Sequence, residues 1–126
     1  LNDQLRGFYR AMYEDDQKRR RYLAATQMEP TDARRMFPCF DEPAYKSVFS
    51  IKAVIDKRLT ALSNAPQIRE ESVSAHKKAV TFEPTPQMSS YLLALVVGDL
   101  KCGGEVQGGG VPVRVWAVSG REHLGK

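Results

Sequence analysis

The sequence predicts an all-β domain built as a β-sandwich, and three observations support this prediction. Short segments rich in β-branched and aromatic residues recur along the chain, separated by turns that contain glycine or proline. Some of these segments alternate apolar and polar residues, which is the period of a half-buried strand. The length of 126 residues suits a single domain with a core of its own.

The first elements are predicted to form one antiparallel hairpin. Residues 5–13 are rich in aromatic side chains and favour a strand, whereas the charged residues 14–21 favour a loop. Residues 22–28 favour the returning strand, which ends at Glu29-Pro30.

A short helical turn over residues 31–37 is expected next. Thr31 can cap it, and Asp32 in its first turn would favour the positive end of the helix. Pro38 ends the turn, because the residue before a proline is disfavoured in helical geometry. On chemistry alone this segment is a structural corner, in which two acids cap or pair with two bases: Asp41 and Glu42 with Arg34 and Arg35.

The next segment with a strand pattern is 47–55, whose inward face is expected to hold Phe49, Ile51, Ala53 and Ile55. Residues 59–62 and 80–83 predict two short strands, with a polar connection over 67–79 between them. Residues 91–97 are apolar on both faces, which predicts a strand buried between two layers. Residues 101–110 contain five glycines and are expected to be a flexible turn before a last strand over 111–118.

Charge and composition argue against several classes of function. The net charge is +4, and the one dense basic run, 18–21, lies just after three acids at 14–16, so it indicates a solvated loop rather than a nucleic-acid surface. The longest apolar run is far shorter than the ~20 residues of a membrane helix, so no membrane segment is expected within this chain.

Metal and nucleotide chemistry have weak support. The two histidines lie far apart, and the two cysteines lack metal-ligand spacing, so no metal site is predicted in this chain. Residues 120–126 match part of a phosphate-binding loop, but the preceding strands lack the alternating pattern that such a loop needs. Two cysteines and no glycosylation acceptor favour a cytoplasmic location; whether Cys39 and Cys102 pair stays open.

Five ordered blocks of sequence resemble the N-terminal domain of zinc aminopeptidases of the aminopeptidase N and puromycin-sensitive type. The most specific block runs from Thr-Gln-Met-Glu-Pro at 26–30 to Phe-Pro-Cys-Phe-Asp-Glu-Pro at 37–43. The other four are Gly-Phe-Tyr-Arg at 7–10, Ala-Leu-Ser-Asn-Ala-Pro at 61–66, Thr-Pro-Gln-Met-Ser-Ser-Tyr-Leu at 85–92 and Val-Val-Gly at 96–98.

This resemblance implies that Gln27 and Glu29 bind the substrate, a peptide with a free N-terminus. Glu29 would anchor the α-amino group, and Gln27 would line the pocket for the first side chain. Met28 stands where the family usually has Phe; because a strand alternates faces, this departure should affect packing rather than the site. No catalytic residue and no zinc ligand is expected here, because in the family they lie in the following catalytic domain.

Residues 1–126 are therefore expected to be one incomplete N-terminal β domain, whose partners are peptide substrates and the zinc catalytic domain of the same protein. Alone, the chain should be marginally stable, aggregation-prone, inactive and without bound zinc. The alternative is a non-catalytic β-sandwich interaction module that keeps the corner for structure only. A His-Glu-x-x-His motif downstream would favour the enzyme, and a stop codon there would favour the module.

Overall fold

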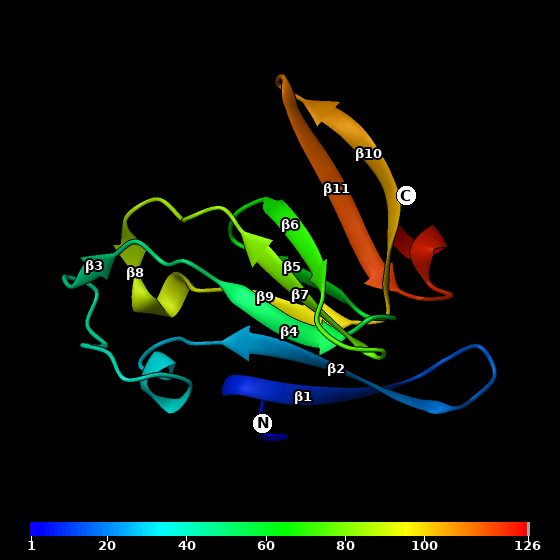
Figure 1. The fold of residues 1–126 in the computed structure, drawn as a ribbon, viewed down its shortest axis with the longest axis horizontal. Coiled ribbons are helices and arrows are strands. Elements are labelled where there is room, and N and C mark those ends of the chain that lie inside the picture. Colours follow the sequence, from blue (N-terminus) through cyan, green and yellow to red (C-terminus); the bar gives the residue numbers. More distant parts are fainter. Residues whose placement is uncertain (126) are drawn as a thin grey trace.

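The computed structural model describes residues 1–125 and confirms the all-β prediction. Two antiparallel sheets pack face to face, and a separate hairpin projects from one end of them (Figure 1). Helical structure is limited to three short 3₁₀ turns: η1 (Ala33–Arg35), η2 (Ser90–Leu92) and η3 (Glu122–Gly125).

The larger sheet has four strands in the order β1-β2-β9-β5. The strands are β1 (Gly7–Glu14), β2 (Arg20–Gln27), β9 (Leu95–Gly98) and β5 (Thr60–Ser63). The predicted N-terminal hairpin is confirmed, with β1 and β2 in register from Gly7 opposite Gln27 to Glu14 opposite Arg20.

The smaller sheet has the order β4-β7-β6, formed by β4 (Lys52–Asp56), β7 (Lys77–Phe82) and β6 (Gln67–Ser72). The core between the two sheets contains Ile55, Ala61, Val80 and Phe82, with Ile51, Ala53, Leu59 and Val97 packed around them. The apolar face predicted for 47–55 therefore points into the core at residues 51, 53 and 55.

Two predictions in this part of the chain are wrong in detail. The strand predicted over 47–55 begins only at Lys52, and residues before it form a separate short pair of β3 (Lys46–Ser47) with β8 (Met88–Ser89). Residues 67–79 are not simply a polar connection, because they contain β6. This strand lies at a sheet edge with nearly all of its side chains exposed, so it carries no apolar alternation that could reveal it.

The segment 91–97 is a strand only in its second half. Its first residues belong to η2, and β9 begins at Leu95. β9 lies between β2 and β5, so it is an internal strand of its sheet. The predicted burial between two layers is only partly right, because Val96 and Val97 are half-buried and Leu92 is exposed. The edges of this sheet are β1 and β5.

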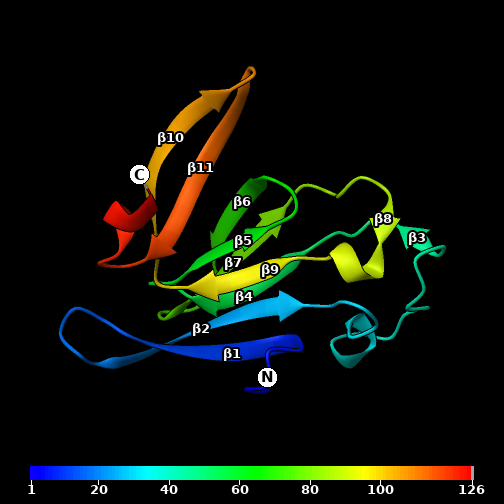
Figure 2. The same cartoon turned by 180° about the vertical axis from the view of Figure 1, so that it is seen from behind.

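The flexible turn predicted over 101–110 is mostly a strand. β10 (Leu100–Gly108) pairs with β11 (Val111–Val118), and only Gly109 and Gly110 form the tight turn, both with positive φ. Their φ values of 59° and 83° are the left-handed geometry that glycine adopts at low cost. Figures 1 and 2, which view the molecule from opposite sides, both show this hairpin standing away from the sandwich.

Three smaller observations bear on the predictions above. Cys39 and Cys102 are both free thiols in the structure. Within residues 1–125, no helix is long and apolar enough to cross a membrane. In the segment 120–126, which resembles a phosphate-binding loop, the described part is a turn followed by η3, and Lys126 lies outside the described residues.

Candidate functional site

The two predicted substrate-binding residues lie at the end of β2. Gln27 is the last residue of this strand, and Glu29 follows two positions later; both are exposed. Met28 between them is buried, with 2% of its surface exposed. The change from the usual Phe to Met therefore falls on the packed side of the chain, as predicted, while Gln27 and Glu29 face solvent.

Glu29 lines a shallow pocket of about 260 Å³ with Pro30, Pro43 and Tyr91. The antiparallel register explains why residues so distant in sequence meet here. Ala25 lies opposite Val96, so the chain leaving β2 runs alongside the chain that enters β9. Gln27 is not among the residues that line this pocket. Of the two predicted site residues, only Glu29 therefore contributes to it.

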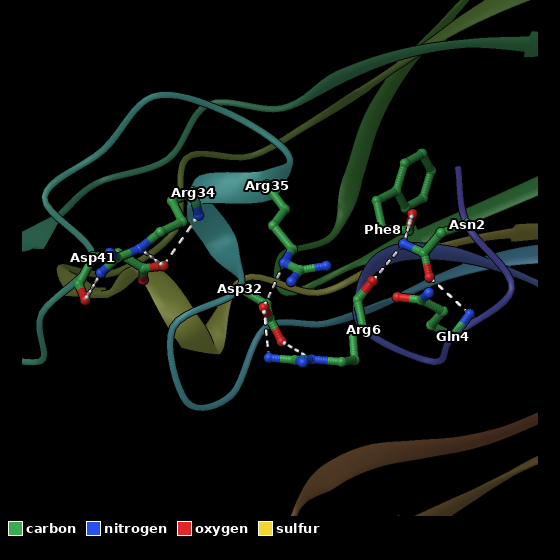
Figure 3. Close-up of polar contacts among 8 residues, drawn as sticks. All are labelled: Asn2, Gln4, Arg6, Phe8, Asp32, Arg34, Arg35 and Asp41. Atoms are coloured by element: carbon green, nitrogen blue, oxygen red, sulfur yellow. Dashed lines mark hydrogen bonds and ion pairs between the residues drawn. The ribbon is translucent and has the colours of Figure 1, made fainter.

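Two buried carboxylates lie in the segments that supply the pocket residues, and the first belongs to Asp32, which is 2% exposed. It accepts hydrogen bonds from Arg6 Nε at 2.9 Å and Arg6 Nη2 at 3.3 Å, and pairs with Arg35 Nε at 2.9 Å (Figure 3). Its backbone N–H donates to the carbonyl of Met28 at 2.7 Å. Asp32 thereby ties the Glu29-Pro30 turn to η1 and to the segment before β1.

The second buried carboxylate is that of Asp41, on the other side of η1. It accepts from the Arg34 backbone N–H at 3.0 Å, from Arg34 Nε at 3.3 Å and from Ser90 Oγ at 2.7 Å. Burial acts to raise the pKa of Asp41, but the hydrogen bonds from Ser90 and Arg34 outweigh burial and leave the pKa below its usual value. The carboxyl is therefore held ionised.

The predicted pairings around η1 are partly right. The Asp41–Arg34 pair is confirmed, whereas Arg35 pairs with Asp32 and not with an acid of the 41–42 turn. The Thr31 cap is wrong: Asp32 occupies the cap position of η1 and makes no side-chain capping bond. The carboxylate of Asp32 is instead paired with two arginines, Arg6 and Arg35, each with a nitrogen at 2.9 Å.

Two serines join the 41–43 segment to η2. Ser89 Oγ donates to the carbonyl of Pro43 at 2.6 Å, and Ser90 Oγ donates to Asp41. These bonds hold Pro43 and Tyr91 together, and both residues line the pocket of Glu29. We call the set of Asp32, Asp41 and their partners Arg6, Arg34, Arg35 and Ser90 the carboxylate corner.

A glycine allows the corner to close against β1. Gly7 has a φ of 64°, and a Cβ atom there would lie 3.3 Å from both Arg35 Cβ and the carbonyl oxygen of Asp32. Any other residue would be strained in conformation and crowded by η1. The Gly-Phe-Tyr-Arg block at 7–10 therefore has a structural reason to begin with glycine.

The pocket combines one carboxylate with an aromatic ring and two prolines. A carboxylate accepts charge-assisted hydrogen bonds from an ammonium, and an aromatic face attracts the same cation.

Among residues 1–125, no group of three His, Cys, Asp or Glu side chains is placed to hold a metal ion, so the residues present do not form a zinc site. Sequence reasoning missed Pro43 and Tyr91 as pocket residues, although both lie within the quoted sequence blocks.

These features define an all-β domain with a pocket that contains one carboxylate, flanked by ion pairs in which the carboxylates are buried and the arginines are half exposed. The chain belongs to the peptidase M1 family, because residues 1–92 match the Peptidase M1 N-terminal domain.

Relatives agree over the whole chain. It is 51% identical to Aminopeptidase 2 of Candida albicans and 46% identical to the puromycin-sensitive aminopeptidase of Caenorhabditis elegans, with all of this chain covered in both cases. It is 44% identical, over 94% of its length, to endoplasmic reticulum aminopeptidase 1 of Rattus norvegicus. The chain spans 13% of the length of each of these three relatives.

Proposed function

We propose that this chain is the substrate-anchoring domain of a zinc-dependent aminopeptidase that removes N-terminal residues from peptides. The observation that carries the proposal is the contrast around Glu29. Its carboxylate is exposed in a pocket, while Met28 and Asp32 beside it are buried and fix the turn. Because the backbone of this turn is fixed, a ligand that binds Glu29 has to order only the side chain.

In this proposal Glu29 accepts hydrogen bonds from the α-ammonium of the substrate. A hydrogen bond to a charged group in a water-poor cleft contributes about 1.5–3 kcal/mol, whereas an exposed ion pair contributes less than about 1 kcal/mol. Gln27, on the same side of the chain, offers an amide donor and acceptor to the first side chain. Zinc would be held by residues outside this chain, so residues 1–126 alone would be inactive.

The test uses the protein that carries both this domain and a zinc domain. Glu29→Ala should lower kcat/KM on a free-amine peptide substrate at least ~10-fold, which corresponds to about 1.4 kcal/mol. Glu83→Ala is a matched control, because Glu83 is also exposed and lies outside the Glu29 pocket. Unchanged kinetics for Glu29→Ala would remove Glu29 from the site.

A second candidate is a non-catalytic interaction module, and the exposed apolar side chains of the β10–β11 hairpin favour it. The two candidates differ in what the gene encodes after this domain. A His-Glu-x-x-His motif on a predicted helix there supports the peptidase, and a stop codon supports the module.

For location we propose the cytoplasm, on the basis of the two free cysteines and the lack of a glycosylation acceptor in the sequence. Protein isolated under thiol-blocking conditions should contain both thiols in reduced form. A Cys39–Cys102 disulfide in that material would count against this location.

A further inference from the structure

The pocket of Glu29 contains a carboxylate and an aromatic ring but no basic side chain. Its lining consists of Glu29, Pro30, Pro43 and Tyr91, so within the part of the chain that the structure describes neither lysine nor arginine contributes to it. A carboxylate that shares a pocket with an aromatic ring attracts a cation, because the carboxylate is negative and the face of the ring carries negative potential. The cation that this pocket suits must therefore come from a ligand.

The arginines closest in sequence to Glu29 are already paired with other acids. Arg35 pairs with Asp32 and Arg34 pairs with Asp41, each through Nε, at 2.9 Å and 3.3 Å (Figure 3). Both of these carboxylates are buried, and a buried carboxylate that loses its partner is costly. The carboxylate corner thus keeps its own bases on its own acids and leaves the charge of Glu29 for a ligand.

The ring of Tyr91 is also left without a cation of the protein. Within residues 1–125, the one cation–π contact is that of Arg10 with Tyr22, whose ring centroid lies 4.7 Å from the guanidinium carbon. Tyr91 is half-buried and lines the pocket, so part of its side chain packs while the rest is accessible from the pocket. A ligand cation in the pocket can therefore reach this ring.

Hydrogen bonds on both sides hold Tyr91 in place. Before it, the hydroxyl of the preceding serine donates to the buried carboxylate of Asp41 at 2.7 Å. After it, the side chain of Asn64 donates to the carbonyl of Leu92 at 2.9 Å and accepts from the backbone N–H of Ala94 at 2.7 Å. Two segments that are distant in sequence therefore fix the backbone of η2, the turn that carries Tyr91.

We propose that Tyr91 is the second half of the ammonium anchor: the face of its ring contacts the α-ammonium that Glu29 binds, and Asp41 and Asn64 are positioning residues that hold the ring at the pocket. This inference rests on the proposed function, because it takes the ligand of Glu29 to be a peptide N-terminus. An ammonium has several N–H donors, so it can bond to the carboxylate and still direct an N–H at the ring. The two prolines add apolar surface to the pocket, and the attraction between a cation and a ring is stronger where less water surrounds the cation.

The test measures how strongly the protein prefers a free amine when position 91 is changed. The probes are alanine hydroxamate and its N-acetylated form, whose Kd values are measured by titration calorimetry with the longer protein that carries both this domain and a zinc domain. Tyr91→Leu removes the ring and should lower the preference for the free amine roughly 3- to 10-fold, whereas Tyr91→Phe keeps the ring and should retain the preference. Tyr45→Leu is the matched control and should retain it too, because Tyr45 is an exposed tyrosine outside this pocket.

Three results would overturn the inference. An equal preference in Tyr91→Leu and in the unmodified protein would mean that the ring does not contact the ammonium. A loss of preference in Tyr91→Phe would assign the effect to the hydroxyl and not to the ring. Equal weakening of both probes by Tyr91→Leu would show that Tyr91 only supports the fold of the pocket.

Asn64 gives a second readout, because a positioning residue acts through the ring that it positions. Asn64→Ala should lower the same preference, and combining it with Tyr91→Leu should add little further loss. Additive losses would mean that Asn64 does not act through Tyr91. The proposed function fails separately, if Glu29→Gln leaves the preference for the free amine unchanged. An effect of Glu29→Gln without any effect of Tyr91→Leu contradicts only the present inference.

Discussion

The carboxylate corner buries charged side chains, whereas the β10–β11 hairpin exposes aliphatic ones. In the corner, Asp32 and Asp41 are buried and ionic, while in the hairpin four valines are exposed. Both arrangements reverse the usual distribution, in which carboxylates face water and aliphatic side chains face the core. The corner is costly to build and is held by bonds from several segments, which suits a rigid support for Glu29. The hairpin leaves its aliphatic side chains in water, so these side chains add little to the stability of the chain.

The largest expected difference between the two regions is in the free energy of unfolding that is lost when an apolar side chain is truncated. Met28→Ala should destabilise residues 1–126 by about 2–5 kcal/mol, because Met28 is buried and its removal leaves a cavity. Val113→Ala should change the stability of the same chain by no more than about 0.5 kcal/mol, because Val113 is half exposed there. Urea unfolding of both variants measures the difference, and equal losses would contradict it.

The next effect compares one ion pair from each region. Asp41→Ala should cost about 1–3 kcal/mol, since it leaves Ser90 and the Arg34 backbone N–H without their acceptor. Glu105→Ala breaks the exposed pair with Arg114 and should cost less than about 1 kcal/mol. Thermal unfolding of the two variants side by side checks this order; a larger loss for Glu105→Ala would show that the corner is not the more rigid region.

The smallest effect is a dependence of stability on pH. Because the pKa of Asp41 in the folded protein lies below its ordinary value of 3.8, its contribution is fully present above that value. The contribution is lost as the pH falls through the lowered folded pKa. Tm measured between about pH 2 and 6 should therefore fall less steeply at the acid end for Asp41→Asn than for the unmodified chain. Parallel curves would mean that Asp41 is not held ionised.

The same comparison explains what the sequence can predict. Three features can be predicted from strand-like sequence patterns or continuous apolar runs. They are the N-terminal hairpin, the inward face at 51, 53 and 55, and strand β9. β6 and β10 could not be predicted in this way. β6 is an edge strand with exposed polar side chains, and β10 contains three glycines. Each is a strand because it pairs with a neighbouring strand, and not because its residues favour a strand locally.

The candidate site was predictable in part for a similar reason. Glu29 follows a strand, and the alternation around Met28 indicates that its side chain faces outward. Pro43 and Tyr91 reach the pocket only through the register of β2 with β9 and the bond from Ser89 to Pro43. The pairing of Asp32 with Arg6 spans 26 positions, and nothing in the local sequence distinguishes it from a helix cap.

Glu29 is proposed to bind the α-ammonium of the substrate, and the role of the whole domain follows from this contact. The most direct measurement is the Kd of the longer protein for an amino-acid hydroxamate and for its N-acetylated form, with unmodified protein and with Glu29→Gln. If Glu29 binds the ammonium, the unmodified protein should prefer the free amine at least ~10-fold, and Glu29→Gln should remove most of this preference, a change of about 1.4 kcal/mol. A preference that is the same in both proteins would contradict it.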